Sequence, residues 1–265
     1  MTFFGKFPLT AYDLEIPLGN TFAKPKTITD IFKRIALKQS LEEVGTVYGS
    51  YTIKDEDTPE IIADKLYGSS GLHWVVLLAN EIINPVFDWP LSERKLVPFI
   101  DHKYPGSTFF LNSLLISGQF RAGLDVTTVS GDAKGTVTAF DANLSSMVVE
   151  NISGVFEEGD TLVQDIGEPV PVTGELTRRV SFSKDALKFF ADPQGKPLNP
   201  LPLRAGYIQG GFGFPGIADV VTNEQYERNQ NEGKRTIRLI HPDRLEEILR
   251  DIETIFRRNE LRRTL

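Results

Sequence analysis

Cysteine is absent from this chain of 265 residues, and histidine is scarce. Without thiols the chain cannot form disulfides, bind a metal through thiolates or use a cysteine nucleophile. Its histidines, His73, His102 and His241, lie far apart in the sequence, whereas a zinc enzyme needs about three converging ligands. We therefore predict no metal site, no cofactor and no catalytic residue, in a protein that is not an enzyme.

Long apolar runs and an excess of positive charge are also lacking. No run approaches the ~20 apolar residues that span a bilayer, and residues 1–6 lack the order of a signal peptide. The formal net charge is -7, whereas a nucleic-acid binder needs a cationic footprint. We predict neither membrane insertion nor a nucleic-acid partner. The late basic residues fit helix C-terminal charge and a partner contact; they are Arg257, Arg258, Arg262 and Arg263.

Several local patterns resemble active-site motifs but lack the required context. Residues 211–216 have the spacing of a dinucleotide fingerprint, yet Pro215 removes the strand-to-helix turn that the motif needs. Residues 181–184 have the spacing of a serine-lysine acylase without its supporting motifs. Acidic residues at 55–60 suit a turn and a helix start better than a calcium loop. The acidic residues at 157–160 could act as the acid and base of a glycosidase only if their carboxyl groups lay at the right distance from each other.

Aromatic residues and prolines crowd residues 1–26, which predicts an extended arm lying on another surface. After it, apolar residues recur at helical spacing with Thr29 as the expected N-cap, which predicts a short helix. The aromatic residues of the arm are Phe3, Phe4, Phe7, Tyr12 and Phe22. The apolar residues of the helix pattern are Ile28, Ile31, Phe32 and Ile35.

Residues 51–80 have the pattern of a strand followed by two helices. Residues 51–53 alternate as a strand, and Thr58 before Pro59 is typical of a helix start. Gly68 can adopt the left-handed conformation that ends a helix, and a second helix is expected over about 70–80. Asn84 and the proline after it are expected to begin the return to a second short strand. This order predicts a βααβ module.

The rest of the chain changes character twice. Residues 135–140 and 144–150 alternate about a turn, and further short strands are expected near 154–162 and 171–173, which predicts a small antiparallel barrel or sandwich. An apolar stripe then marks a final helix that starts at Pro242; its residues are Leu245, Ile248, Leu249, Ile252 and Phe256. We divide the chain into an arm (1–26), a helix plus compact module (27–108), an inserted β module (109–180), an irregular Pro/Gly-rich linker and strand (181–240) and an amphipathic helix (241–265).

The compact module resembles LysM domains. The similarity rests on the opening at residues 51–54, the cap at 57–58, the Ile-Ala pair at 62–63, the Leu-Tyr-Gly triplet at 66–68, Trp74 and Asn80. Residues 28–34, 72–80 and 84–90 extend it to the LysM-like baseplate wedge family of T4-like contractile-tail phages, and residues 219–257 resemble that family less well. The predicted fold class is therefore α+β, a LysM-like βααβ module with flanking helices and an inserted β-barrel or sandwich.

The resemblance implies a structural subunit that joins neighbouring wedges into a closed six-fold ring around the hub of the tail. Its partners would be other wedge and hub proteins, and its location the virion baseplate after assembly in the host cytoplasm. A peptidoglycan-binding tail protein and a tail-associated wall hydrolase remain alternatives. We expect the interfaces at the arm, the bend near residue 88 and the last helix, through Phe3, Phe4, Phe7, Tyr12, Phe22, Phe87, Trp89, Leu245, Ile248, Leu249, Ile252 and Phe256.

Overall fold

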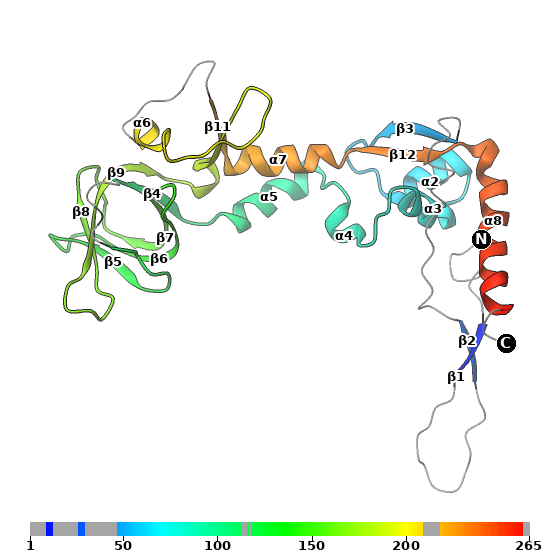
Figure 1. Cartoon of the computed structure of the whole chain (residues 1–265), viewed down its shortest axis with the longest axis horizontal. Helices are drawn as coiled ribbons and strands as arrows, with labels where there is room; N and C mark the ends of the chain where they lie inside the picture. Colours follow the sequence, from blue (N-terminus) through cyan, green and yellow to red (C-terminus); the bar gives the residue numbers. More distant parts are fainter. Residues whose placement is uncertain are drawn as a thin grey trace, which may run out of the picture. The chain divides into compact units, whose positions relative to one another are not determined.

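The structure, a computed structural model, describes residues 9–12, 26–29, 47–112, 116, 118–208 and 218–261 (Figure 1). Within these ranges, side chains are described from residue 47 to residue 252 and at residue 254. The described residues mix helices and strands, as the α+β prediction requires. They form two compact units, Met1–Ser92 with Asn231–Leu265 and Glu93–Gln230, which we call unit 1 and unit 2.

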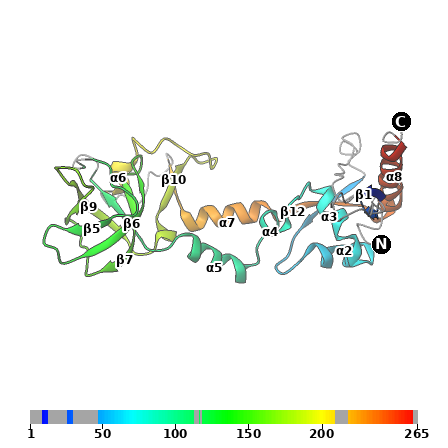
Figure 2. The ribbon, with the colours of Figure 1, turned by 90° about the horizontal axis from the view of Figure 1, so that it is seen from below.

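Unit 1 contains a two-stranded antiparallel sheet whose strands lie far apart in the sequence (Figure 1, Figure 2). In chain order its central elements are β3 (Tyr48–Thr52), α2 (Pro59–Tyr67), the 3-10 helix η2 (Ser70–Leu72), α3 (His73–Ala79), β12 (Thr236–Ile240) and α8 (Pro242–Leu261). β12 pairs with β3, placing Ile237 opposite Tyr51. The order strand, helix, helix, strand is therefore present, but the prediction that the second strand follows residue 84 is wrong.

The local chemistry of α2 agrees with the sequence. The Thr58 hydroxyl accepts a hydrogen bond from the Ile61 amide at 3.3 Å, and Pro59 occupies the first turn, where no amide is needed. Gly68 ends the helix at φ +68°, a conformation that side chains with a Cβ disfavour. Both predicted helix ends are thus confirmed, because each depends on residues next to it in the sequence.

The core of unit 1 joins both parts of the chain. Ile62 and Ala63 of α2, Val75 of α3 and Ile240 of β12 are almost fully buried in one cluster. The side chain of Asn80 bonds to the backbone of β12. It accepts a hydrogen bond from the Arg238 amide at 2.7 Å and donates one to the Arg238 carbonyl at 2.8 Å. Unit 1 therefore needs the C-terminal segment to complete its sheet and core.

Two short strands are described in the N-terminal region. β1 (Leu9–Tyr12) pairs antiparallel with β2 (Lys26–Thr29), so part of the predicted arm is a hairpin ladder. Ile28 and Thr29 belong to β2 and not to a helix, because they pair with Thr10 and Leu9. The remaining residues of the predicted helix, 30–35, lie outside the described residues.

Unit 2 contains a closed antiparallel barrel with the strand order β4-β7-β6-β5-β8-β9 (Figure 1). The strands are β4 (Ser107–Leu111), β5 (Asp125–Thr128), β6 (Lys134–Asp141), β7 (Ser146–Ser153), β8 (Thr161–Gln164) and β9 (Val172–Val180). The predicted hairpin is confirmed as β6 and β7, with Val137 opposite Val149. Buried apolar side chains such as Phe109 and Leu176 form its core, so the inserted β module is a barrel and not a sandwich.

Helices and a second small sheet complete unit 2. They are α5 (Glu93–Lys103), the 3-10 helix η3 (Ser183–Asp185), β10 (Leu187–Ala191), α6 (Arg204–Ile208), β11 (Asp219–Thr222) and α7 (Asn223–Gly233), whose last three residues belong to unit 1. β10 pairs with β11, and Glu227 of α7 accepts from Tyr104 at 2.6 Å and from Lys103 at 2.8 Å. Residues 181–240 are thus more regular than the predicted linker. The sequence of α7 has few apolar residues to mark it as a helix.

Gln164 gives a test of how the barrel is held together. Its fully buried side chain accepts from the Arg121 amide at 2.6 Å and donates to the Arg121 carbonyl at 3.0 Å. Gln164→Ala leaves both backbone groups unpaired, so we expect unit 2 to lose ~1–3 kcal/mol of unfolding free energy in urea. Gln230→Ala, at an exposed position of α7, is the matched control. Equal stability of the two variants would contradict this role of Gln164.

Candidate protein-interaction surface

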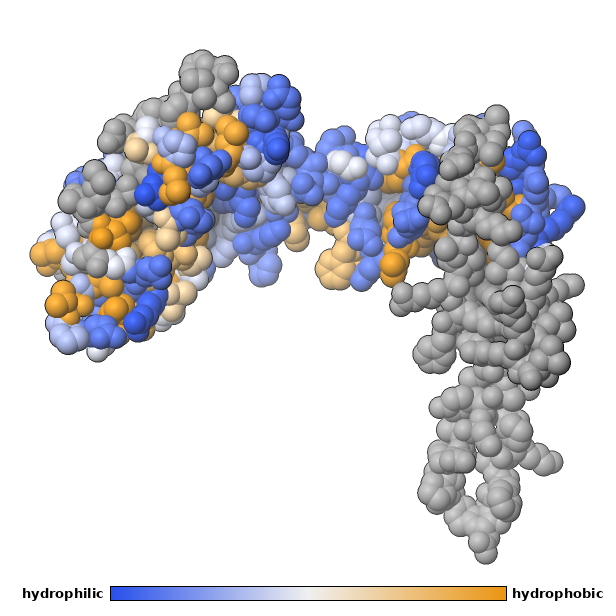
Figure 3. Space-filling view, viewed as in Figure 1, coloured by the Kyte–Doolittle hydropathy of each residue, from blue (hydrophilic) through white to orange (hydrophobic). Residues whose placement is uncertain are grey.

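An exposed apolar turn lies where the sequence suggested a second strand. Asn84 accepts from the Val86 amide at 3.1 Å and Pro85 follows it, so the chain forms the single helical turn α4 (Pro85–Asp88). Around this turn Ile83 is 82% exposed, Val86 75% and Phe87 71%. We call these three side chains the α4 knob. Figure 3 shows hydrophobic surface over α4, beside hydrophilic surface on either side. Neighbouring apolar side chains left in water are typical of a binding surface.

The backbone under the α4 knob is held on both sides. The Asp88 carboxylate accepts from the Asn84 amide at 3.1 Å, which closes the turn on itself. Lys234, just before β12, donates from Nζ to the Phe87 carbonyl at 2.6 Å. Trp89 donates from Nε1 to the Asp57 carbonyl at 2.9 Å, which ties the end of α4 to the start of α2. A knob held in this way loses little backbone freedom when a partner covers it.

Asp57, whose carbonyl accepts the hydrogen bond from Trp89, also makes several hydrogen bonds through its side chain. Its buried carboxylate accepts from Tyr51 Oη at 2.7 Å, from Lys65 Nζ at 2.7 Å and from the Lys54 amide at 3.1 Å. Burial by itself raises the pKa of Asp57, but the hydrogen bonds from Lys65, Tyr51 and the Lys54 amide outweigh it and hold that pKa below 3.8. The carboxylate is therefore charged at neutral pH and bonded on both oxygens.

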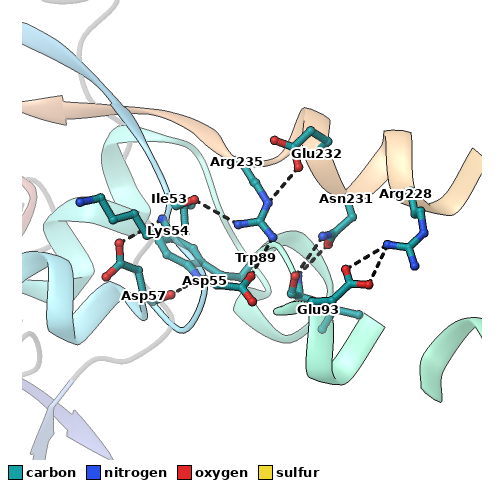
Figure 4. Close-up of polar contacts among 11 residues, drawn as sticks. Ile53, Lys54, Asp55, Asp57, Trp89, Glu93, Arg228, Asn231, Glu232 and Arg235 are labelled. Atoms are coloured by element: carbon teal, nitrogen blue, oxygen red, sulfur yellow. Dashed lines mark hydrogen bonds and ion pairs between the residues drawn. The ribbon is translucent and has the colours of Figure 1, made fainter. Parts of the chain in front are cut away.

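Asn231 near the end of α7 and Arg235, between α7 and β12, tie the N-terminal and C-terminal parts of unit 1 together (Figure 4). Arg235 reaches the Ile53 carbonyl at 3.2 Å and the Asp55 carboxylate at 2.9 Å. Asn231 accepts from the Leu91 amide at 2.7 Å and donates to the Leu91 carbonyl at 2.9 Å. The Asn231 contacts fix the backbone just after α4, and the Arg235 contacts fix the segment between β3 and α2. Like Lys234, they come from residues that the sequence analysis did not single out.

A shallow hollow of about 390 Å³ adjoins the α4 knob. Its walls carry the carboxylates of Glu81 and Asp88, the ammonium of Lys234 and the side chains of Ile82 and Ile237. Glu81 and Asp88 are exposed, whereas the Lys234 ammonium is bonded to the Phe87 carbonyl. The surface thus combines an apolar projection with an adjacent concave area that carries charged groups of both signs.

The structure separates the predicted interface residues into distinct groups. Phe87 is exposed in the α4 knob, whereas Trp89 is half-buried and bonded within unit 1. Ile248 and Ile252 are buried in the core of unit 1, which leaves their side chains almost no surface for a partner. Leu245 and Leu249 are half-buried against the same core. The side chains of Tyr12 and Phe256 are not described. The remaining four residues lie outside the described part of the chain; they are Phe3, Phe4, Phe7 and Phe22.

The candidate catalytic and metal-binding patterns have structural roles where they are described. Asp55 binds Arg235 and Asp57 binds Lys65, so both carboxylates belong to ion pairs. Asp160 accepts from the Glu157 amide at 2.8 Å, which closes a turn. Among the described residues, no group of three or more histidine and acidic side chains is placed to hold a metal ion. None of the described helices is both long enough and apolar enough to span a membrane.

Comparison with known proteins finds a similarity over the N-terminal part of the chain. Residues 6–104 match the family described as Base plate wedge protein 53. An 89-residue stretch is 32% identical to baseplate wedge protein gp53 of Enterobacteria phage T4, over 34% of this chain and 40% of that protein. The chain thus spans less than half of that relative, and the barrel begins only after the family match ends. Over residues 6–104, which include α2, α3 and the α4 knob, this chain is similar to phage baseplate wedge proteins.

Proposed function

We propose that this chain is a structural subunit of the baseplate wedge of a contractile phage tail. The match to baseplate wedge proteins covers residues 6–104, and the proposal extends the same role to the whole chain. It places the protein in the virion baseplate, bound to other baseplate proteins, with no reaction to catalyse. The polar networks described above have structural roles in holding the α4 backbone and unit 1 together, and this favours a scaffold.

The finer part of the proposal concerns architecture. We infer that β3, α2, α3 and β12 form a LysM-like module, because their order and the antiparallel pairing of the two strands agree with a βααβ unit. In this chain the module is interrupted: the second strand comes after unit 2 and not after the second helix. We further propose that the module joins neighbouring wedges into a closed ring around the hub.

The observation that carries the proposal is the α4 knob inside the matched region. A scaffold subunit needs apolar surface that its own core does not use, presented on a backbone that is already ordered. Ile83, Val86 and Phe87 meet the first requirement, and the bonds from Lys234 and Trp89 meet the second. The sequence placed an interface at this bend through Phe87 and Trp89. The structure favours Phe87 and its two apolar neighbours for that role.

The location can be tested on purified phage particles. We expect antibody-gold against the full chain to label the distal end of the tail, at the baseplate. Label on the capsid, or no label on the particle, would refute the proposal. Sedimentation of the purified chain with peptidoglycan provides a second test: saturable binding would favour a glycan-binding tail protein, and turnover of labelled wall material would favour a hydrolase.

Phe87→Asp tests the knob itself. A charged side chain at this position cannot enter an apolar partner pocket without a large desolvation penalty. We expect incorporation into baseplates, measured by complementation of a strain that lacks the protein, to fall by about tenfold or more, since a lost anchor costs ~2 kcal/mol or more. Val129→Asp, at another exposed apolar position, is the control and should assemble normally. Normal assembly with Phe87→Asp would remove the knob from the interface.

A further inference from the structure

The strand β3 turns its backbone groups alternately toward β12 and away from it. The Ile53 amide donates to the Arg235 carbonyl at 2.8 Å, and the Val47 carbonyl accepts from the His241 amide at 2.9 Å. Hydrogen-bonded pairs of an antiparallel ladder recur at every second residue. The odd-numbered positions of β3 therefore bond to β12, and the backbone groups of Ser50 point out of the sheet.

The two outer edges of this sheet differ. On β12, the Asn80 side chain bonds both the amide and the carbonyl of Arg238. On β3, Ser50 and Thr52 are exposed, and their outward backbone groups make no hydrogen bond within the described part of the chain. Natural proteins protect such an edge with a charge, a proline or a bulge. Residues 47–53 contain no charge and no proline, and their register with β12 has no bulge, so the outer edge of β3 is open to another strand.

The β1–β2 ladder of unit 1 has only two strands among those that the structure describes. Each strand has four residues, and an isolated two-stranded ladder is at best marginally stable in water. β2 begins with Lys26, a charge that opposes further pairing at its edge, whereas β1 contains no charged residue. The outer edge of β1 is therefore the one suited to a third strand.

We propose that β1 of one copy of this chain pairs with the outer edge of β3 of a second copy. Within one chain the two ladders remain separate sheets, although they belong to the same unit. Residues 30–46, which join β2 to β3, would span about 60 Å if fully extended, enough chain for the ladder to reach a neighbouring copy. Backbone hydrogen bonds recognise an added strand of this kind, so the contact needs no pocket and no charge pair.

This contact rests on the proposed function and gives one way to link neighbouring wedges. The edges of β1 and β3 are different surfaces, so the contact is heterologous, and each copy has one edge of each kind to offer. Such contacts repeat from copy to copy and either close into a ring or continue as a filament. The sequence predicted that residues 1–26 lie on another surface, and the outer edge of β3 is the surface that we assign to them.

The absence of native cysteine allows a direct test on the full chain. One tagged chain carries Thr52→Cys in β3, and a differently tagged chain carries Thr10→Cys or Ala11→Cys in β1. Neighbouring residues of a strand point to opposite faces, so one of the two β1 thiols lies on the face of Thr52. Under mild oxidation we expect the faster of these two mixtures to form mixed disulfide at least about tenfold faster than the control, because pairing raises the effective concentration of the thiols. The control replaces Thr52→Cys with Ser153→Cys, at an exposed position of β7.

Ser50→Pro, added to the Thr52→Cys chain, blocks the edge and spares the pairing with β12. The Ser50 amide points away from β12, so a proline there removes only the outward donor. We expect the cross-linking rate to fall to that of the control, while the urea midpoint of tryptophan fluorescence stays that of the natural chain. Ser50→Lys should lower the rate in the same way through its charge, and it keeps the test decisive if the proline disturbs the strand.

Two results would overturn the contact between copies. One is an equal cross-linking rate in the test and control mixtures. The other is a disulfide that forms only within a chain carrying both thiols, which would place β1 on β3 of the same copy. If the chain still labels the baseplate in either case, the proposed function stands without this contact.

Discussion

Ending the chain after Gln230 is expected to abolish the cooperative unfolding of unit 1, although the whole region that matches the wedge family is still present. The truncation removes β12 and α8, and with them Ile240, Ile248 and Ile252 from the core. Ile62 and Val75 would then face water, at a cost of ~1.5–3 kcal/mol for each such side chain. A domain is stable by only ~5–15 kcal/mol, so the loss of a strand and a helix exceeds what unit 1 can tolerate.

Tryptophan fluorescence measures this effect in unit 1 alone, because Trp74 and Trp89 are the two tryptophans of the chain and both belong to unit 1. We expect the emission of the truncated chain to resemble that of the chain in urea. Ending the chain after Ile252 is the matched control, because it keeps β12 and both buried isoleucines of α8. Native-like emission and a cooperative transition after truncation at Gln230 would show that residues 47–92 fold without β12.

Asp57→Asn is expected to lower the unfolding free energy of unit 1 by ~1–3 kcal/mol, the range for a buried polar group that loses its partners. The asparagine amide carries no charge to pair with Lys65, and its nitrogen cannot accept a hydrogen bond from either Tyr51 or Lys65. Urea unfolding followed by tryptophan fluorescence gives the value. Asp64→Asn, at an exposed position of the helix α2 that follows Asp57, removes an equal charge and is the control. Equal midpoints for the two variants would contradict a central role for Asp57.

The effect of Asp57→Asn should depend on pH. The folded protein holds the pKa of Asp57 below the unfolded value of 3.8, so the stabilisation is complete well above pH 3.8 and is lost as the pH falls through the folded pKa. The stability gap between the natural chain and Asp57→Asn should therefore close in acid.

Unit 1 should also lose stability at high pH, through Tyr51. The hydrogen bond to Asp57, burial and the charge of the Asp57 carboxylate raise the pKa of Tyr51 to about 12. The folded state therefore favours the protonated tyrosine, and its stability should fall as the pH rises from 10 to 12.

Local patterns predicted the elements whose causes are local. Thr58 with Pro59 and Gly68 mark the two ends of α2, and the alternation around residues 141–143 predicted the β6–β7 hairpin. The start of α8 at Pro242 was equally visible. Each of these features depends on residues within a few positions of one another, so no knowledge of the rest of the chain was needed.

The sequence predicted an interface at the α4 bend but could not show which of its side chains bond within the chain. Phe87 and Trp89 both looked suited to a partner, yet the Trp89 indole bonds to the Asp57 carbonyl while Phe87 remains in water. The stripe on α8 showed that one face is apolar without showing what covers it, and unit 1 itself buries Ile248 and Ile252. Hydrophobic spacing predicts that a face will be covered, but it does not distinguish an internal core from another subunit.

By itself, the sequence determined which segments are helices or strands where neighbouring residues decide the backbone, and it excluded thiol chemistry. Tertiary structure alone decided that β12 completes the sheet begun by β3, with Ile237 opposite Tyr51. It also decided that Lys234 bonds the backbone of the α4 knob and that Gln164 bonds the backbone of Arg121 in the barrel. Such pairings depend on which distant segments are adjacent after folding, and no periodicity within one segment encodes that information.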